Sequence, residues 1–205
     1  MTTLVAVQKD GFACLAADSL TSFGDLRLTD GMSVGKGKLL RVGDAVLGIP
    51  GSSAHGGVLA SYFARLKRPP RLGDRKEIFE AWRKLHVALK DDYFLNPKDE
   101  AADPYESTQL TALVVGPRGI FGVFSLREVF EFSRFWALGS GRDFALGALE
   151  ALYDRLPTAR EVAEAAVAVA CVFDKGSSPP VESEVVRLDP GAGALTPPRR
   201  TTGRA

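Results

Sequence analysis

Short apolar segments separated by turn residues dominate the first quarter of the sequence, and this pattern predicts paired strands. In each predicted hairpin, two apolar segments flank residues that favour a tight turn. The segments are Thr3–Val7 and Phe12–Ala17 around Lys9-Asp10-Gly11, and Lys38–Val42 and Ala45–Ile49 around Gly43-Asp44. The polar, glycine-rich residues 18–37 between the hairpins are expected to form a loop or an irregular strand.

Helical spacing of apolar residues follows the second hairpin. The first helix is expected to begin near Ser52, whose hydroxyl can cap it, and to end before Pro69. The second is expected to begin at Asp74, with Glu77 completing a capping box. Its apolar residues recur every three or four positions, which predicts a face for the core or for a subunit interface. They are Ile78, Phe79, Trp82, Leu85, Leu89 and Tyr93.

The second half of the sequence repeats the order of strands followed by helices. The predicted strands are Leu110–Val115, Ile120–Ser125, Val129–Ser133 and Trp136–Leu138, the predicted helices are Gly141–Arg155 and Thr158–Phe173, and the last strand is Glu182–Leu188. Helices grouped on the faces of antiparallel sheets indicate an α+β fold, stacked as helix, sheet, sheet, helix. We expect one domain over residues 1–188, and a flexible tail over residues 189–205, where proline, glycine and arginine dominate.

Composition excludes several classes of protein. Lysine and arginine number 26 against 25 acidic residues, and this balance argues against a nucleic-acid-binding protein. Only two histidines and two widely separated cysteines are present, so we expect no metal site and two buried, reduced thiols. No apolar segment is long enough to span a membrane, and the first residues do not resemble a signal peptide. These features predict a cytoplasmic location and no membrane partner.

Thr2 is the first candidate for chemistry. Removal of Met1 would leave Thr2 with an α-amino group beside its own hydroxyl. The amine, with an ordinary pKa of about 7.7–8.0, can accept the hydroxyl proton near neutral pH, so one residue supplies both nucleophile and base. Because many unrelated proteins begin with Met-Thr, Thr2 by itself indicates little.

Five further motifs appear downstream, each next to the start or the end of a predicted element. Asp18 follows the second strand, and Lys36 leads into the third. The remaining three are Gly48-Ile49-Pro50-Gly51-Ser52 before the first helix, Gly139-Ser140-Gly141 between a strand and a helix, and Asp174-Lys175-Gly176-Ser177 after the last helix. Gly35-Lys36-Gly37-Lys38 lacks the full spacing of a phosphate-binding loop, so nucleotide binding is rejected there.

Taken in order from Thr2 to Leu188, these motifs resemble the N-terminal threonine hydrolases of the proteasome β-subunit and HslV type, and most closely the bacterial proteasome homologues. The resemblance implies a four-layer αββα sandwich and a threonine endopeptidase. It also implies stacked rings of six or seven copies acting on peptides or unfolded proteins. An ATP-dependent unfoldase is a further candidate partner, and the chemistry needs no cofactor.

The resemblance also implies roles for individual residues. Thr2 matches the nucleophile, Asp18 the aspartate that holds a catalytic lysine, and Gly51 the glycine whose N–H forms the oxyanion hole. Ser140, Asp174 and Ser177 match a group around the terminal amine, and Ile49 would line an apolar pocket of medium size for the substrate. Lys36 matches the lysine because it precedes Leu40 by four residues and Gly51 by fifteen. The stretch before it is about two residues longer than the family pattern, so Lys38 is the second candidate.

Each candidate also has an ordinary interpretation. The aspartates can be carboxylates at element ends, the lysines a solvated pair, and the basic stretch Arg65–Lys76 a solvated loop or a docking patch. Two alternative functions stay open at this stage. One is a non-catalytic ring subunit, favoured if Met1 is retained, and the other is a small-molecule amidase that uses the same N-terminal chemistry.

Overall fold

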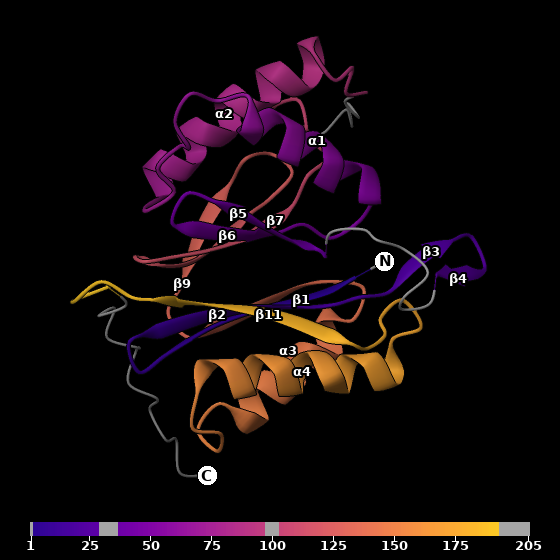
Figure 1. Cartoon of the computed structure of the whole chain (residues 1–205), viewed down its shortest axis with the longest axis vertical. Helices are drawn as coiled ribbons and strands as arrows, with labels where there is room; N and C mark the ends of the chain where they lie inside the picture. Colours follow the sequence, from indigo (N-terminus) through magenta and orange to yellow (C-terminus); the bar gives the residue numbers. More distant parts are fainter. Residues whose placement is uncertain (1, 29–36, 97–102, 193–205) are drawn as a thin grey trace.

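Two antiparallel sheets lie face to face at the centre of the molecule, and a pair of helices covers each outer face (Figure 1). The computed structural model describes residues 2–28, 37–96 and 103–192. The four layers confirm the predicted α+β class and its order of helix, sheet, sheet and helix.

The first sheet contains the amino-terminal hairpin and has the order β10-β1-β2-β11. Its strands are β1 (Thr3–Lys9), β2 (Phe12–Asp18), β10 (Phe135–Gly139) and β11 (Val181–Arg187). Asp10 and Gly11 connect β1 to β2 with positive φ angles of 50° and 79°. Two consecutive residues of this conformation form the turn that matches the twist of a hairpin, which explains the predictive value of Asp-Gly here.

The second sheet has the order β5-β6-β7-β8-β9. Its strands are β5 (Leu39–Val42), β6 (Ala45–Gly48), β7 (Ala112–Gly116), β8 (Gly119–Val123) and β9 (Val129–Phe132). A separate short hairpin of β3 (Thr21–Phe23) and β4 (Leu26–Leu28) projects from the body near the end of β2 (Figure 1). The sequence predicted only a loop or an irregular strand there, because these residues lack an alternating apolar pattern.

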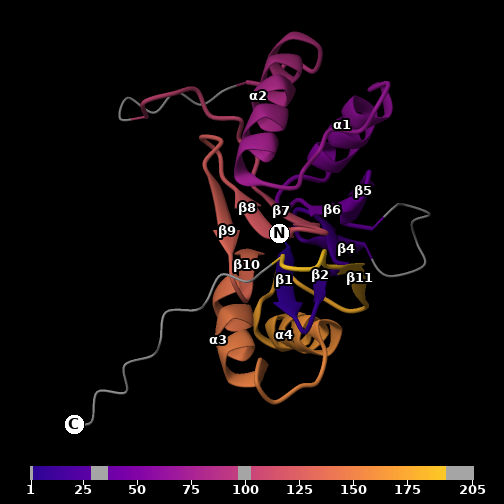
Figure 2. The ribbon, with the colours of Figure 1, turned by 90° about the vertical axis from the view of Figure 1, so that its left-hand side faces the viewer.

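The helices begin where the capping residues predict. On one face lie α1 (Ser53–Ala64), capped by Ser52, and α2 (Arg75–Asp91), where the Asp74 side chain accepts the Glu77 N–H. On the other lie α3 (Arg142–Leu152) and α4 (Ala159–Phe173), and Thr158 and Glu161 form the predicted capping box of α4 (Figure 2). The predicted helical stripe of α2 is buried except at Phe79, which is exposed, and at Tyr93, which lies beyond the end of the helix.

Side chains alternate along the central strands so that both faces of each sheet are buried. In β1, Leu4 and Ala6 pack between the two sheets, whereas Val5 and Val7 pack against α3 and α4. This alternation is expected of a strand with both faces covered, and it produces an almost continuous apolar sequence. It also gives Thr2 and Thr3 opposite directions, because they are neighbours at the end of the same strand.

The end of the third helix differs from the prediction. The helix predicted to reach Arg155 ends at Leu152. Residues 193–205 of the predicted tail lie outside the described residues, so the tail and the boundary at residue 188 stay predictions. Of the helices in the described ranges, none combines the length and the apolar character that crossing a membrane requires.

Candidate active site

Thr2 lies at the amino end of β1, in the middle of the first sheet and at one end of the sandwich. It is only 3% exposed. Its carbonyl oxygen accepts a hydrogen bond of 2.8 Å from the Ser140 N–H, just after β10. Gly139 has a φ of 98°, and a Cβ atom there would collide with the Thr2 carbonyl oxygen, so this approach requires glycine. The sheet therefore fixes the backbone of the candidate nucleophile.

Asp18 is fully buried at the end of β2 and accepts four hydrogen bonds. Its Oδ1 accepts the Thr3 N–H and the Lys38 Nζ, each at 2.8 Å. Its Oδ2 accepts the N–H groups of Leu20 at 3.0 Å and of Ser178 at 3.2 Å. A buried carboxylate is stable only when such partners replace water. The N–H donors fix its orientation, and the remaining contact holds the lysine ammonium.

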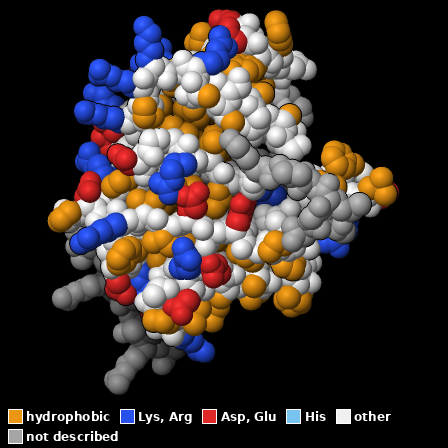
Figure 3. All heavy atoms as spheres, viewed as in Figure 1, with side chains coloured by type: hydrophobic (Ala, Val, Ile, Leu, Met, Phe, Trp, Pro, Cys, Tyr) orange, Lys and Arg blue, Asp and Glu red, His pale blue; other side chains and the backbone are white. Residues whose placement is uncertain are grey.

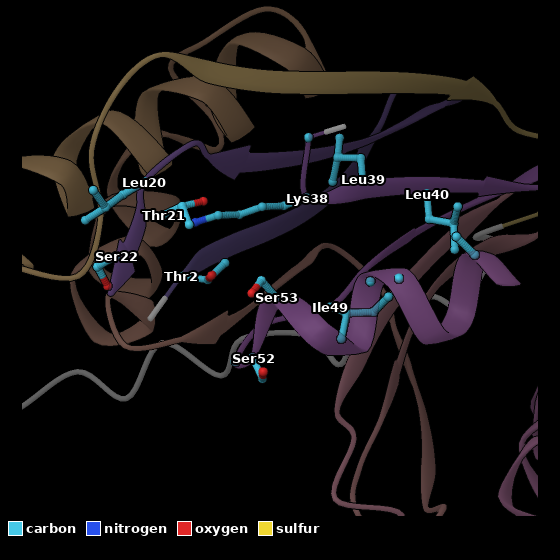
Figure 4. A pocket seen from close by; sticks show the side chains of 15 residues that line it. Thr2, Leu20, Thr21, Ser22, Lys38, Leu39, Leu40, Ile49, Ser52 and Ser53 are labelled. Atoms are coloured by element: carbon cyan, nitrogen blue, oxygen red, sulfur yellow. The ribbon is translucent and has the colours of Figure 1, made fainter. Parts of the chain in front are cut away.

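Among the described residues, Lys38, the second candidate of the sequence, is the lysine that the structure brings to Asp18. The Lys38 side chain extends from the start of β5 along the floor of the cavity toward Thr21 and Thr2 (Figure 4). Its ion pair with Asp18 is largely shielded, with side-chain exposures of 15% and 0%. Lys36 lies outside the described residues.

The structure brings Ser140, Asp174 and Ser177 together in a second cluster beside Thr2. The hydroxyls of Ser140 and Ser177 each donate to Asp174 Oδ2 at 2.7 Å, and the Gly176 N–H donates to Oδ1 at 3.1 Å. Burial, the largest single influence, raises the pKa of Asp174, but the three hydrogen bonds together bring this pKa below its ordinary value. The carboxyl is therefore ionised at neutral pH.

A cavity of about 450 Å³ opens beside Thr2, between the start of β5 and the amino end of α1 (Figure 4). Gly51, the candidate oxyanion donor, lines it with a φ of 104°. Pro50 has no backbone N–H, so of these two neighbouring residues only Gly51 can donate a backbone hydrogen bond to an oxyanion. Ile49 lines the same cavity, as predicted for the substrate pocket. The other lining residues are Leu20, Thr21, Ser22, Gly37, Lys38, Leu39, Leu40, Ser52, Ser53, Gly56, Gly57 and Ala60.

Two contributors to the site were not predicted from the sequence. The fully buried Thr3 side chain lies 2.6 Å from the Ser177 hydroxyl, and Glu182 on β11 accepts the backbone N–H of Lys38. For Thr3, its place in β1 next to Thr2 was an available signal. For Glu182 there was none, because a glutamate in a strand is usually an ordinary solvent-facing residue.

Solved structures share this arrangement of sheets and helices. Two structures of Thiobacillus denitrificans BPH, one of them in complex with epoxomicin, align with this chain at a TM-score of 0.85 and 42% identity, over 92% of this chain and 99–100% of the other. The chain belongs to the proteasome β-subunit and HslV type of N-terminal nucleophile hydrolases.

A solved structure of lower sequence identity has the same fold. Eukaryotic HslV from Trypanosoma brucei aligns with a TM-score of 0.62 and 20% identity, over 90% of this chain and 99% of the other. A scan against protein-family models and a search of curated protein sequences give no match. The chain thus has the fold of a proteasome-related peptidase of the N-terminal nucleophile type.

The polar groups that gather at this end of the sandwich are hydroxyls, a lysine ammonium and carboxylates. In the described ranges, no three histidine, cysteine or acidic side chains come together in a way that could hold a metal ion. What the described residues do bring together is a hydroxyl residue, a lysine held by an aspartate, and a hydroxyl–carboxylate network.

Proposed function

We propose that the protein is a threonine endopeptidase that cleaves peptide bonds with the hydroxyl of Thr2 once Met1 has been removed. The observation that carries the proposal is the position of Thr2 on a 450 Å³ cavity that is also lined by Lys38, the lysine paired with buried Asp18. Membership of the family supports it, as does the 42% identity to a protein with a solved epoxomicin complex.

In the proposed reaction, the α-amino group of Thr2 takes the hydroxyl proton while Oγ attacks the substrate carbonyl carbon. The oxyanion accepts the Gly51 N–H, an interaction of the kind that contributes about 3 kcal/mol to catalysis. The amine then gives the proton to the leaving nitrogen as the C–N bond breaks, which leaves an ester on Thr2. Water attacks this ester, the proton passes through the amine back to Oγ, and the carboxylic acid product leaves.

The two clusters have separate roles in this proposal. The Lys38 ammonium favours the developing negative charge on Oγ and disfavours a second positive charge on the amine nearby. Asp18 holds that ammonium in place. The ionised Asp174, with Ser140 and Ser177, orients the terminal amine and stabilises it while it carries the proton.

We further propose that copies of the chain assemble into stacked rings of six or seven and act on peptides or unfolded proteins, with an ATP-dependent unfoldase as a candidate partner. Relatedness to BPH and HslV supports assembly. So does the projecting β3–β4 hairpin, whose Phe23 and Leu26 are 64% and 74% exposed and form an apolar protrusion (Figure 3). A cytoplasmic location stays a prediction.

Incubation of the purified, untagged protein with epoxomicin, followed by intact-mass measurement and peptide mapping, tests the proposed chemistry. Epoxomicin carries an epoxyketone, which adds to the hydroxyl and the amine of one residue with no leaving group, so the mass gain equals the whole inhibitor. We expect loss of Met1 and one adduct on Thr2, and none in Thr2→Ala. Retained Met1 with no adduct would contradict the proposal and favour a non-catalytic ring subunit.

A further inference from the structure

Strand β11 presents two glutamates to the edge of the facing sheet. The Glu182 side chain accepts the backbone N–H of Lys38, the residue just before β5, and the Glu184 side chain pairs with Arg41 within β5. Between them, Ser183 points the other way and donates to Glu164 on α4 at 2.6 Å. This alternation is that of a regular strand, so Glu182 and Glu184 necessarily face β5 together.

The position of Glu182 along β11 brings it beside the ion pair of the candidate active site. In the pairing of β11 with β2, Glu182 lies opposite Ala17, and Val181 lies opposite Asp18. Two neighbouring strands, β11 and β2, thus bind the backbone and the side chain of Lys38. Glu182 binds its backbone nitrogen, and Asp18 binds its side-chain nitrogen at 2.8 Å.

The contact between Glu182 and Lys38 requires a residue without a side chain at position 37, which is Gly37. A Cβ atom at Gly37 would overlap the carboxylate of Glu182, so the glycine leaves the space that the carboxylate occupies. Burial is the largest influence on the Glu182 carboxyl and raises its pKa, whereas the N–H groups of Lys38 and Leu39 and the Lys38 ammonium act in the opposite direction. The nearby Asp18 carboxylate also raises this pKa, and the net direction is upward, so it is the contact with the backbone N–H of Lys38 that ties the Glu182 carboxylate to the residues before β5.

We propose that Glu182 is a positioning residue that fixes the start of β5, so that the Lys38 ammonium reaches Asp18 beside Thr2. The proposal rests on the proposed function, because it assigns Glu182 a part in the same reaction. Glu182 does not touch the reacting atoms and acts only through Lys38. A displacement of about 1 Å in a catalytic group can lower a rate about 100-fold, so a contact of this kind affects turnover.

The alternative is that Glu182 merely ties the two sheets together. Glu184 provides the matched control, because it lies on the same strand and the same face and contacts the same strand β5. Its partner Arg41 is 51% exposed and has no contact with Asp18 among the interactions of the described residues. A general tie between the sheets would give similar effects for both glutamates, whereas positioning of Lys38 affects Glu182 alone.

The test compares Glu182→Ala, Glu182→Gln and Glu184→Ala in the full-length protein, with a fluorogenic peptide as substrate. For Glu182→Ala we expect kcat to fall at least about tenfold, and by a larger factor than KM changes, since the Lys38 ammonium beside Thr2 is the group that loses its position. Glu182→Gln keeps an acceptor oxygen and should recover part of the loss. Glu184→Ala should leave both constants within about twofold of the wild type.

Gly37→Ala disturbs the same contact, because the added Cβ atom would overlap the Glu182 carboxylate. It also provides a second test in case Glu182→Ala does not fold. It should lower kcat in the wild-type background and cause little further loss in the Glu182→Ala background, because the carboxylate that it displaces is already gone. Fully additive losses, an unchanged kcat in Glu182→Ala, or an equal loss in Glu184→Ala would overturn the proposal.

Amide hydrogen exchange of residues 37–40 separates this proposal from the proposed function. We expect faster exchange at the Lys38 amide in Glu182→Ala than in the wild type, whether or not the protein is active. A wild type that neither turns over peptide nor reacts with epoxomicin would end the proposed function, and the exchange rate would still decide the Glu182 contact. An active wild type with unchanged exchange and kcat in Glu182→Ala would end the Glu182 proposal alone.

Discussion

The hydroxyl of Thr3 lies 2.6 Å from that of Ser177, and this contact joins the two clusters of the candidate active site. Thr3 gives its N–H to Asp18, which holds Lys38, while Ser177 donates its hydroxyl to Asp174. Because Ser177 uses its proton on the carboxylate, Thr3 is the donor in the contact between the two hydroxyls. Thr3, the residue after the candidate nucleophile, thus connects the two clusters.

We expect Thr3→Val to weaken this link without changing the shape of the side chain. The free energy of unfolding should fall by about 1 kcal/mol, the usual contribution of one hydrogen bond, and kcat should fall as well, since Ser177 loses a fixed partner. Thr3→Ser keeps the hydroxyl and should retain more activity than Thr3→Val. Urea denaturation and peptide hydrolysis measure the two effects, and equal activity in both variants would argue against the link.

Lys38→Met should abolish nearly all turnover, and Lys36→Met should have an effect of less than about twofold. Loss of a group that assists proton transfer typically costs about 10²–10⁴-fold in rate. Asp18 keeps three N–H donors in Lys38→Met, so we expect the variant to fold. Initial rates, with thermal unfolding as the check on folding, compare the two lysines. A larger loss in Lys36→Met would reverse the assignment.

The lowered pKa of Asp174 predicts that its contribution to the stability of the fold is lost at low pH. Its pKa is lower in the folded protein than its ordinary value, so the ionised carboxylate stabilises the fold. The contribution is fully present above about pH 4 and is lost as the pH falls through the folded-state pKa. The difference in unfolding free energy between wild type and Asp174→Asn should therefore shrink on acidification. Denaturant titrations across this range would contradict the assignment if the difference grew.

Ile49 predicts the side chain that is preferred before the cleaved bond. A panel of fluorogenic peptides should favour medium-sized apolar residues at this position. Ile49→Ala should shift the preference toward larger residues, by a factor of about 10–200 for one or two methylene groups. Ser22→Ala, which changes a polar residue lining the same cavity that caps no helix, is the control. Preference for acidic residues by the wild type would contradict the assignment of the pocket.

The two thiols should resist alkylation in the folded protein. Burial, as the largest influence, raises the pKa of Cys171 to about 11 and that of Cys14 to about 12. Because the thiolate is the reactive form, iodoacetamide should modify neither cysteine appreciably at neutral pH. In denaturant, where a thiol has a pKa of about 8.5, both should react. Rapid labelling of native protein, followed by intact mass, would contradict these values.

The sequence predicted the layers and most element boundaries because the signals are local. Asp10-Gly11 specifies the first hairpin, and Thr158 with Glu161 specifies the start of α4, each within a few residues. The β3–β4 hairpin was missed because its apolar residues Phe23 and Leu26 are exposed and do not alternate with a buried face.

The choice between Lys36 and Lys38 could not be made from spacing. The spacing to Leu40 and Gly51 favoured Lys36, whereas the long stretch after Asp18 left Lys38 open, so the two counts pointed to different residues. Long-range contacts decide such cases, and the structure provides one in the Lys38–Asp18 ion pair. Glu182 was missed for the same reason, because its relation to Lys38 depends on how two sheet edges meet.

Burial of Thr2 within the central strand pair has a practical consequence for anyone who makes this protein. Because Thr2 lies between β10 and the cavity, a peptide added at its amino group would, under the proposed function, begin at the reacting hydroxyl and remove the base. An amino-terminal affinity tag would then act like a covalent inhibitor until a protease releases it just before Thr2. A purification handle belongs at the carboxyl end, and a deliberately blocked amino end offers a way to store the protein in a latent form.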